Sequence, residues 1–252
     1  MITFSLQSGS NGNAIYVETG GVRLLFDAGI SGKQARERMA AHGRDIRAVD
    51  GLLITHDHTD HVRCAGIYQR LFGIPIYMTE ATQRACRRVL GQVRDVRHFN
   101  AGATLEFGSV LVHSHSTPHD AADGVTFIVE SAGKRLGIFT DLGHPNDALV
   151  TQLRSVDAAY LESNYDPLML EEGPYPADLK ARIRGAGGHI SNEESAQLIQ
   201  MCDGRHGWIA LAHLSEQNNH PSVALRTHRR LLGDQRVLHV AGRYNVSEIY
   251  RL

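Results

Sequence analysis

The loop from Thr55 to His61 concentrates side chains that bind metal ions. Its pattern H-x-H-x-D-H places His56, His58, Asp60 and His61 within six residues. In extended backbone, residues two apart point the same way, so His56 and His58 can share one ion. Asp60 and His61 follow where the chain turns toward a helix and can reach a second ion. Imidazole and carboxylate ligands suit Zn, Mn or Fe, so the loop predicts a metal site.

Three more candidate ligands follow apolar segments elsewhere in the chain. His119 comes after a strand ending near His115, Asp141 after the segment 135–140, and His213 after the segment 208–212. Each alone is an ordinary surface residue. Together they lie where strand ends of an α/β protein converge on one sheet edge, which is the usual place for a site. A site with two ions needs more ligands than the loop alone supplies, and these three residues are the candidates.

The elements that must position these residues alternate between strands and helices. Turn signals and capping residues bound them, and the capping box Ser191-Asn-Glu-Glu194 opens one helix. We expect an α/β fold in which two packed mixed sheets are flanked by helices, a four-layer αβ/βα sandwich. Residues 1–252 contain no linker-like stretch and are expected to form one domain. The expected strands are 2–6, 14–18, 22–26, 51–55, 75–78, 109–114, 125–130, 135–140, 157–162, 208–212, 236–240 and 245–250, and the expected helices are 31–42, 62–72, 79–90, 191–202 and 221–232.

Composition narrows the class of protein. The 252 residues carry 26 basic and 27 acidic side chains, a net charge of −1, which argues against a general polyanion-coating protein. No apolar run reaches the ~18 residues of a membrane helix, and the first residues lack the basic and apolar regions of a signal peptide. Three widely spaced cysteines suit a reducing compartment. We therefore expect a cytoplasmic protein with no membrane contact. The sequence does not indicate an obligate protein partner.

The loop, the lone His119, the Asp141 after a strand and the His213 before a final helix resemble the metallo-β-lactamase superfamily over essentially the whole chain. The resemblance implies the αβ/βα sandwich and two divalent metal ions, with zinc first and Mn or Fe as alternatives. By that resemblance, His56, His58 and His119 bind the first ion. Asp60, His61 and His213 bind the second ion, and the carboxylate of Asp141 bridges the two. Asp27 orients the loop without binding metal.

Further segments are similar to the YycJ/WalJ-like subfamily, which is associated with nucleic-acid phosphodiester hydrolysis, including exonuclease activity. Gly188-His189-Ile-Ser is also similar to a ribonuclease Z motif whose His assists the leaving group, which implies a catalytic role for His189. One position departs from the subfamily: Tyr165 stands where a His is usual, so substrate identity stays open. The segments carrying this resemblance are Ser8–Asn13, Leu161–Asn164, Gly173–Pro176, Gly188–Glu193 and His213–Asn219.

The expected activity is metal-dependent hydrolysis of a phosphodiester in nucleic acid. A hydroxide bridging the two ions would attack phosphorus, Asp60 would also accept a proton, and His189 would protonate the leaving oxygen. A small-molecule hydrolase of the same fold, acting on a cyclic phosphate, thioester or lactone, is the alternative. A flavin-linked oxygen reducer is disfavoured because His58 stands where those proteins carry Glu, and a non-catalytic binder would be expected to lose ligands.

Several residues keep two interpretations. Ser10, Asn11 and Asn13 could contact phosphate oxygens or simply form a turn. His115 and His144 could lie near the metals, although neither is assigned there. Five arginines between residues 84 and 97 are read first as a solvated helix face and second as a patch that follows a phosphate backbone.

Overall fold

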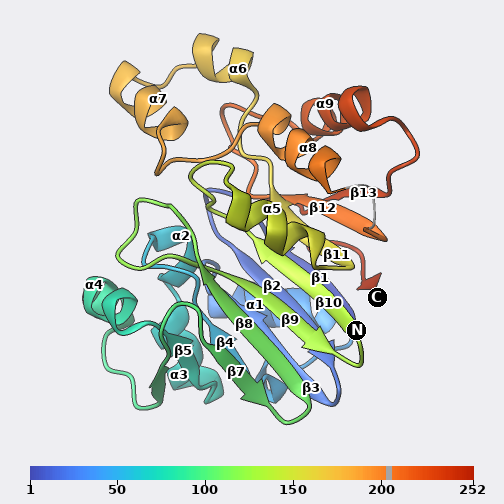
Figure 1. Ribbon diagram of the computed structural model, residues 1–252. Coiled ribbons are helices and arrows are strands. Elements are labelled where there is room, and N and C mark those ends of the chain that lie inside the picture. The colour runs from blue at the N-terminus through green and yellow to red at the C-terminus, as the bar shows by residue number, and fades with distance from the viewer. Residues whose placement is uncertain (203–205) are drawn as a thin grey trace. The chain divides into compact units, whose positions relative to one another are not determined.

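The computed structural model describes residues 1–202 and 206–252. Its strands form two seven-stranded mixed sheets, as the sequence predicts (Figure 1). The chain divides into two compact units. Unit 1 comprises Met1–Ser116, Ala121–Gly133 and Gly242–Leu252, and unit 2 comprises Thr117–Asp120 and Lys134–Ala241.

Unit 1 contains the whole first sheet, in the order β14-β1-β2-β3-β4-β5-β6. Strands β3 to β6 are parallel, and β14, β1, β2 and β3 pair in antiparallel fashion. The parallel part matters for function because the residues after β3 and β4 emerge at one edge. The elements are β1 (Ile2–Gln7), β2 (Ala14–Thr19), β3 (Val22–Phe26), α1 (Gly32–Ala41), η1 (Ile46–Ala48), β4 (Gly51–Leu53), α2 (Thr59–Val62), α3 (Ala65–Phe72), β5 (Ile76–Met78), α4 (Glu80–Leu90), β6 (Val96–His98) and β14 (Tyr250–Arg251).

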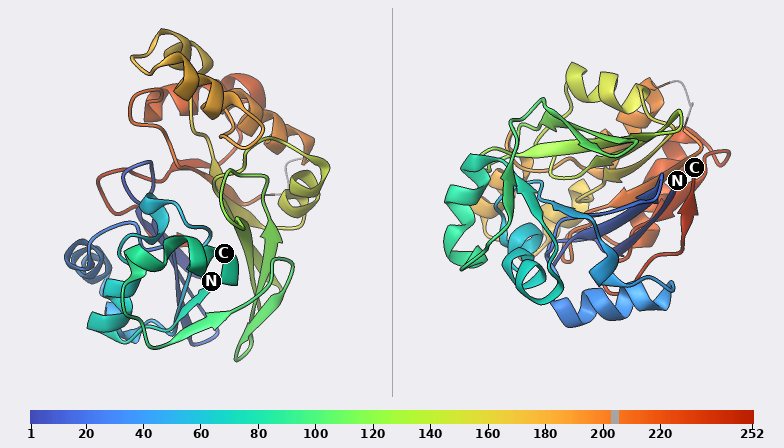
Figure 2. Two further views of the ribbon diagram at one scale, coloured as in Figure 1. Left: turned by 90° about the vertical axis from the view of Figure 1, so that its left-hand side faces the viewer. Right: turned by 90° about the horizontal axis from the view of Figure 1, so that it is seen from below.

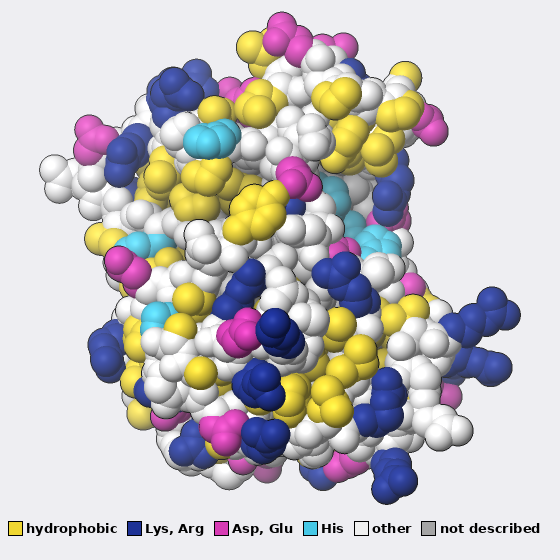
Figure 3. Space-filling view, turned by 180° about the vertical axis from the view of Figure 1, so that it is seen from behind, with side chains coloured by type: hydrophobic (Ala, Val, Ile, Leu, Met, Phe, Trp, Pro, Cys, Tyr) yellow, Lys and Arg dark blue, Asp and Glu magenta, His cyan; other side chains and the backbone are white. Residues whose placement is uncertain are grey.

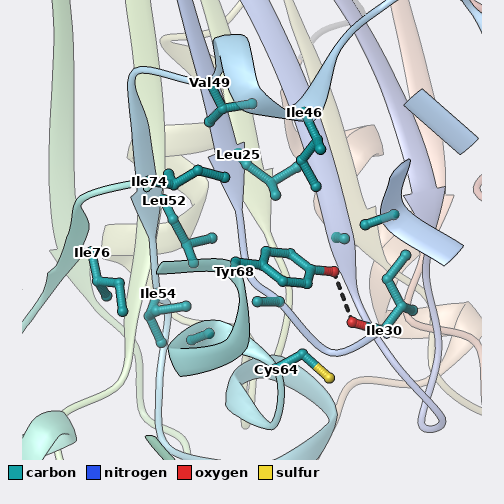
Figure 4. Close-up of a cluster of buried hydrophobic side chains, with 14 of the residues drawn as sticks. Leu25, Ile30, Ile46, Val49, Leu52, Ile54, Cys64, Tyr68, Ile74 and Ile76 are labelled. Atoms are coloured by element: carbon teal, nitrogen blue, oxygen red, sulfur yellow. Dashed lines mark hydrogen bonds between the residues drawn. The ribbon is translucent and has the colours of Figure 1, made fainter. Parts of the chain in front are cut away.

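An apolar core joins this sheet to the helices of unit 1. Tyr68 of α3 is fully buried against Leu25 and Leu52 of the strands, and its hydroxyl donates to the carbonyl of Ile30 at 2.7 Å (Figure 4). The hydrogen bond satisfies the one polar atom of a large buried ring, so the ring can fill the core without an unpaired hydroxyl. Helix α3, which follows the predicted metal-binding loop and α2, is thereby fixed to the sheet.

The two chain ends lie side by side in unit 1 (Figure 2). The amino group of Met1 donates to the carbonyl of Leu252 at 3.0 Å, and β14 pairs with β1. Unit 1 also contains three strands of the second sheet, paired antiparallel in the order β7-β8-β9. They are β7 (Thr104–Phe107), β8 (Val110–Ser116) and β9 (Val125–Ser131).

Unit 2 contains the other four strands of the second sheet, β10 to β13, all parallel to their neighbours. Helices α8 and α9 pack side by side in this unit (Figure 1). Parallel strands send their carboxyl ends to the same edge, so the residues after β10, β11 and β12 are brought together. The elements are β10 (Lys134–Phe139), α5 (Asp147–Arg154), β11 (Ala158–Glu162), α6 (Pro167–Glu172), α7 (Ala177–Arg184), α8 (Asn192–Met201), β12 (Trp208–Ala212), α9 (Pro221–Leu232) and β13 (Leu238–Val240).

The sequence expectations did not include the helices α5, α6 and α7 or the strands β6 and β7. Two further differences have clear causes. The helix expected over 62–72 is interrupted, because the amide of Cys64 donates to Ala28 and so leaves the helical pattern. The strand expected over 245–250 is only Tyr250–Arg251, since the hydroxyl of Ser247 accepts the amide of Ser5 in place of a backbone partner. The expected strand 208–212 and helix 221–232 are confirmed.

The helices of the described residues are all too short or too polar to cross a membrane. Cys64, Cys86 and Cys202, all within the described ranges, form no disulfide with one another.

Candidate metal centre

In unit 1 the predicted metal-binding loop follows β4 and is held by Asp27, which follows the neighbouring parallel strand β3. The Asp27 carboxylate accepts the amide of Thr55 at 2.8 Å and the hydroxyl of Thr55 at 2.9 Å. The same carboxylate lies 2.7 Å from Nδ1 of His61. The sequence expectation that Asp27 orients the loop therefore agrees with its contacts.

These contacts decide which ring nitrogens remain for a metal. A carboxylate can only accept, so Nδ1 of His61 carries the proton and Nε2 carries the lone pair. Thr55 gives its one hydroxyl proton to Asp27 and therefore accepts from Nδ1 of His56 at 2.9 Å. That leaves Nε2 of His56 as the lone-pair nitrogen, and the His–oxygen contact behind each ring is the usual arrangement for a metal ligand.

The rings of the loop lie close together. The ring centres of His56 and His58 are 4.7 Å apart, and those of His56 and His61 are 4.1 Å apart. His58 has extended backbone and Asp60 lies in the first turn of α2, as the residue spacing predicts. Oδ2 of Asp60 lies 3.4 Å from Nε2 of His61. Unit 1 thus brings together the four predicted ligands of the loop.

Asn13 is fixed beside this loop by the turn that precedes β2. Its side-chain oxygen accepts from the amide of Gly9 at 2.9 Å, so its amino group faces the loop. That group lies 3.2 Å from Oδ2 of Asp60 and 3.0 Å from Nε2 of His61. Of the two interpretations of this turn, the structure gives Asn13 an inward contact with the predicted ligands.

Gly29 shows how tightly the supporting loops pack. A Cβ atom at this position would lie 1.7 Å from the carbonyl oxygen of Asp60, so only glycine fits. The Asp60 carbonyl also accepts the amide of Asn13 at 2.8 Å. The backbone of Asp60 is therefore fixed from two sides.

Unit 2 brings together four side chains at the carboxyl ends of its parallel strands. Asp141, Glu162, His189 and His213 each offer a ligand atom within 4.8 Å of the others. Oδ1 of Asp141 lies 3.5 Å from Nδ1 of His213 and 3.8 Å from Nδ1 of His189. His119, also in unit 2, has its Nε2 at 3.7 Å from the same oxygen.

His119 is held by a backbone carbonyl. Its Nδ1 lies 2.9 Å from the carbonyl oxygen of Gly188, so Nδ1 donates and Nε2 carries the lone pair. The loop that supplies this carbonyl leads directly to His189. Gly143 packs against the same loops, since a Cβ there would lie 1.7 Å from the Pro118 carbonyl oxygen.

Glu162, the last residue of β11, has no exposed surface and was not assigned a role from the sequence. Its Oε1 lies 2.7 Å from Nδ1 of His189 and 3.2 Å from Nδ1 of His213, and its Oε2 accepts the amide of Leu142 at 2.9 Å. Burial raises the pKa of this carboxyl, but the charge of His189 and the hydrogen bonds from both imidazoles act against it and lower the pKa to about 2. Glu162 is therefore an anion that orients two histidines. A carboxylate ending a buried strand, as at Asp141, was the available signal.

Three of these polar residues have left-handed backbone. Asp27, Asp141 and His213 have φ angles of 65°, 59° and 54°, and each follows the end of a strand or lies within two residues of it. Such φ angles are uncommon outside glycine, and they cluster at functional sites where the surroundings enforce them. The turn that each makes directs a carboxylate or imidazole out of its strand.

The remaining candidates are His115, His144 and Tyr165. His115 is on β8 in unit 1. Nδ1 of His144 bonds the carbonyl of Ala186 at 2.7 Å, and its ring is exposed. The Tyr165 ring packs with Leu170 and Ile183, and burial raises the pKa of its hydroxyl to about 12, so it is neutral.

Comparison with known proteins gives a consistent result. The sequence profile of the Metallo-beta-lactamase superfamily matches residues 8–178. Exodeoxyribonuclease YycJ of Bacillus anthracis is 34% identical over 222 residues, which are 87% of this chain and 84% of the relative. Exodeoxyribonuclease WalJ of Streptococcus pneumoniae is 35% identical over 227 residues, 88% of this chain and 84% of the relative.

The fold is also shared with solved structures. Zn(2+)-bound PqqB from Methylobacterium extorquens superposes with a TM-score of 0.74 and 19% identity, and covers 100% of both chains. This similarity confirms the expected αβ/βα fold class.

Proposed function

Because the chain belongs to the metallo-beta-lactamase superfamily, we propose that it is a dinuclear metal-dependent phosphodiesterase that acts on nucleic acid as an exonuclease. Membership of this superfamily and the similarity to the YycJ and WalJ exodeoxyribonucleases support this proposal. DNA is the proposed substrate because both relatives are named for it.

One observation carries the metal part of the proposal. In three predicted ligands, His56, His61 and His119, an oxygen partner occupies Nδ1, so the lone pair that an ion would bind is on Nε2. At His61 the Asn13 amino group lies 3.0 Å from that atom. Histidines that fill a core have no need of such uniform orientation, whereas metal ligands do. The donor set is therefore of the right chemistry for zinc, with Mn or Fe as alternatives.

The two ions, when bound, would supply a nucleophilic hydroxide and neutralise charge on the phosphate. The assignment is that of the sequence prediction: His56, His58 and His119 for one ion, Asp60, His61 and His213 for the other, and Asp141 for both.

Asp60 and His189 take the proton-transfer roles. Asp60 is partly exposed, and Asn13 donates to its Oδ2, so the carboxylate is held where it can accept a proton. His189 keeps 19% of its side chain exposed while Glu162 holds its Nδ1, so Nε2 is the atom left to reach the leaving oxygen. The negative Glu162 compensates the positive charge of a histidine that acts as an acid.

A single catalytic domain over residues 1–252 is part of the proposal, and the family profile matches residues 8–178 of it. A cytoplasmic location is part of the proposal, on the ground of the three widely spaced cysteines in the sequence.

A substrate panel tests the proposal. Purified protein is assayed on single- and double-stranded DNA, RNA, cyclic nucleotides, a lactone, a thioester and bis(p-nitrophenyl) phosphate, with metal content measured on the same sample. Release of mononucleotides from DNA by protein with about two ions per chain supports the proposal. Hydrolysis confined to a lactone, thioester or cyclic phosphate contradicts it and favours the small-molecule alternative.

A further inference from the structure

The segment of unit 1 that directly follows the predicted metal-binding loop in sequence is rich in basic residues. The segment 63–98 contains seven arginines and only two carboxylates, a net charge of +5, although the whole chain has a net charge of −1. The positive charge is therefore concentrated in one seventh of the sequence. Such an asymmetry points to a polyanionic partner for this part of the surface.

The centre of this surface is α4. Arg84, Arg87 and Arg88 are exposed and stand three and four residues apart, so they lie on one face of the helix. Arg94 is exposed in the segment that follows α4. In Figure 3 basic side chains project at the right-hand edge, the side on which α4 lies when Figure 1 is turned by half a revolution.

Carboxylates neutralise only part of this face. Glu80 pairs with Arg84 at 2.8 Å, and Asp95 pairs with Arg97 at 3.1 Å. Within the described parts of the chain, no carboxylate pairs with the guanidinium of Arg87, Arg88 or Arg94. These three side chains keep their hydrogen-bond donors available to a ligand.

Helix stability alone does not explain the arrangement. Arg87 and Arg88 lie in the last turn, where the helix dipole favours a positive charge. Arg84 is not in that turn; it pairs with Glu80, but its spacing of four from Arg88 places two like charges next to each other. Arg94 lies beyond the helix and gains nothing from the dipole. Guanidinium groups match phosphate oxygens in pairs.

The helix is also attached to the metal-binding loop. It contacts α2, which contains Asp60 and His61. The Cys86 thiol of α4 lies close enough to Asp57 for that carboxylate to help raise its pKa, to about 11, after burial. The helix that carries these arginines is therefore packed, within unit 1, against the segment that contains Asp60 and His61.

We propose that Arg87, Arg88 and Arg94 form a secondary binding surface for the phosphodiester backbone of the nucleic-acid substrate, on the part of the strand that lies away from the bond being cleaved. This inference rests on the proposed function and adds the path of the substrate. The surface gives affinity for long strands without base specificity, because it contacts phosphates only. Small phosphodiesters are too short to reach it.

The test compares the double variant Arg87→Glu/Arg88→Glu with a matched control on α9, Arg226→Glu/Arg229→Glu, which reverses two exposed arginines of unit 2. Binding of the metal-loaded protein to a fluorescent, hydrolysis-resistant phosphorothioate 20-mer is measured by anisotropy over a range of salt concentrations. Turnover of DNA and of bis(p-nitrophenyl) phosphate is measured in parallel.

We expect the α4 variant to bind the 20-mer ~10–100-fold more weakly and to show a salt dependence reduced by about two phosphate contacts. Its KM for DNA should rise accordingly, while bis(p-nitrophenyl) phosphate turnover and the α9 control keep wild-type values. Adding Arg94→Gln to the α4 variant should weaken binding further.

Wild-type cleavage of DNA with equal affinity and salt dependence in the α4 variant and the α9 control would overturn this inference alone. Wild-type protein that neither binds nor cleaves DNA would overturn it together with the proposed function. Loss of 20-mer binding in the α4 variant of a protein that cleaves only small diesters would support the surface and contradict the exonuclease proposal.

Discussion

Nδ1 of His189 lies 2.7 Å from Oε1 of Glu162, a carboxylate with no exposed surface. The same oxygen lies 3.2 Å from Nδ1 of His213. One buried anion therefore orients both the proposed proton donor and a proposed metal ligand. Unit 1 has an equivalent pair, in which Asp27 lies 2.7 Å from Nδ1 of His61.

The variant Glu162→Gln tests this pairing. Glutamine keeps the size of the side chain but removes the charge, and its amino group cannot accept from an imidazole. We expect DNA cleavage at saturating metal to fall by ~10²–10⁴-fold, the usual value of general-acid help. Metal affinity should fall by ~10–100-fold, as for other residues that orient ligands. The control Glu172→Gln makes the same change on exposed α6 and should leave both quantities unchanged. Wild-type kcat in Glu162→Gln would remove Glu162 from the site.

The variant His189→Ala separates proton donation from structure. The sugar oxygen leaving in DNA cleavage needs a proton, so loss of the donor should slow that reaction by ~10²–10⁴-fold. Nitrophenolate leaves without a proton, so hydrolysis of bis(p-nitrophenyl) phosphate should fall far less, and metal content should be retained. Equal losses on the two substrates would argue that His189 serves structure or metal binding.

At Asp141 the backbone conformation allows a substitution that removes the carboxylate without straining the fold. Its φ of 59° is tolerated by asparagine but strained for alanine. Asp141→Asn should therefore keep the fold, lose one ion and lose nearly all turnover, since a neutral amide is a poor bridge between two cations. Asp141→Ala should show the same loss with ~1–2 kcal/mol lower stability. Two retained ions and wild-type turnover in Asp141→Asn would contradict the bridging assignment, and elemental analysis decides it.

The sequence indicated the candidate ligand residues far better than it indicated the residues that hold them in place. His56, His58 and Asp60 are predictable because their spacing is local and their chemistry is unusual. Asp141 and His213 are predictable as polar residues that follow apolar strands, although nothing in the sequence gives their left-handed backbone. These angles depend on packing between loops that are distant in sequence, as at Gly143.

Glu162 was missed for a related reason. Its role depends on His189, which lies 27 residues later and reaches it only because the loop after α7 returns to the edge of β11. By contrast, the helix over 221–232 was predictable, since a proline near its start and the glycine after it are local signals.

The last prediction concerns stability and pH in unit 2. His228 of α9 has no exposed surface; its Nδ1 lies 2.8 Å from the carbonyl of Ala224 and its Nε2 lies 3.2 Å from the hydroxyl of Ser195 on α8. Burial lowers the pKa of this imidazole from 6.5 to about 4. The folded ring is therefore neutral in a pH range where the unfolded chain takes up a proton.

The direction in which stability changes with pH follows from this difference in pKa between the folded and the unfolded state. Above pH 6.5 neither state is protonated at His228, and its full contribution to stability is present. Between pH 6.5 and 4 the unfolded state binds the extra proton, so the free energy of unfolding falls as pH falls, by about 3 kcal/mol in all. Below pH 4 both states are protonated and this group causes no further loss.

The variant His228→Gln should therefore flatten the fall in stability between pH 6.5 and 4. Urea unfolding at fixed metal content, followed by the single tryptophan, Trp208, in the same unit, measures it. Ser195→Ala is the matched control, because it removes the hydroxyl that bonds Nε2 but leaves the imidazole in place. The control should lower the midpoint at every pH and keep the wild-type slope. A slope in His228→Gln that equals the wild-type slope would show that other groups cause the acid sensitivity of this unit.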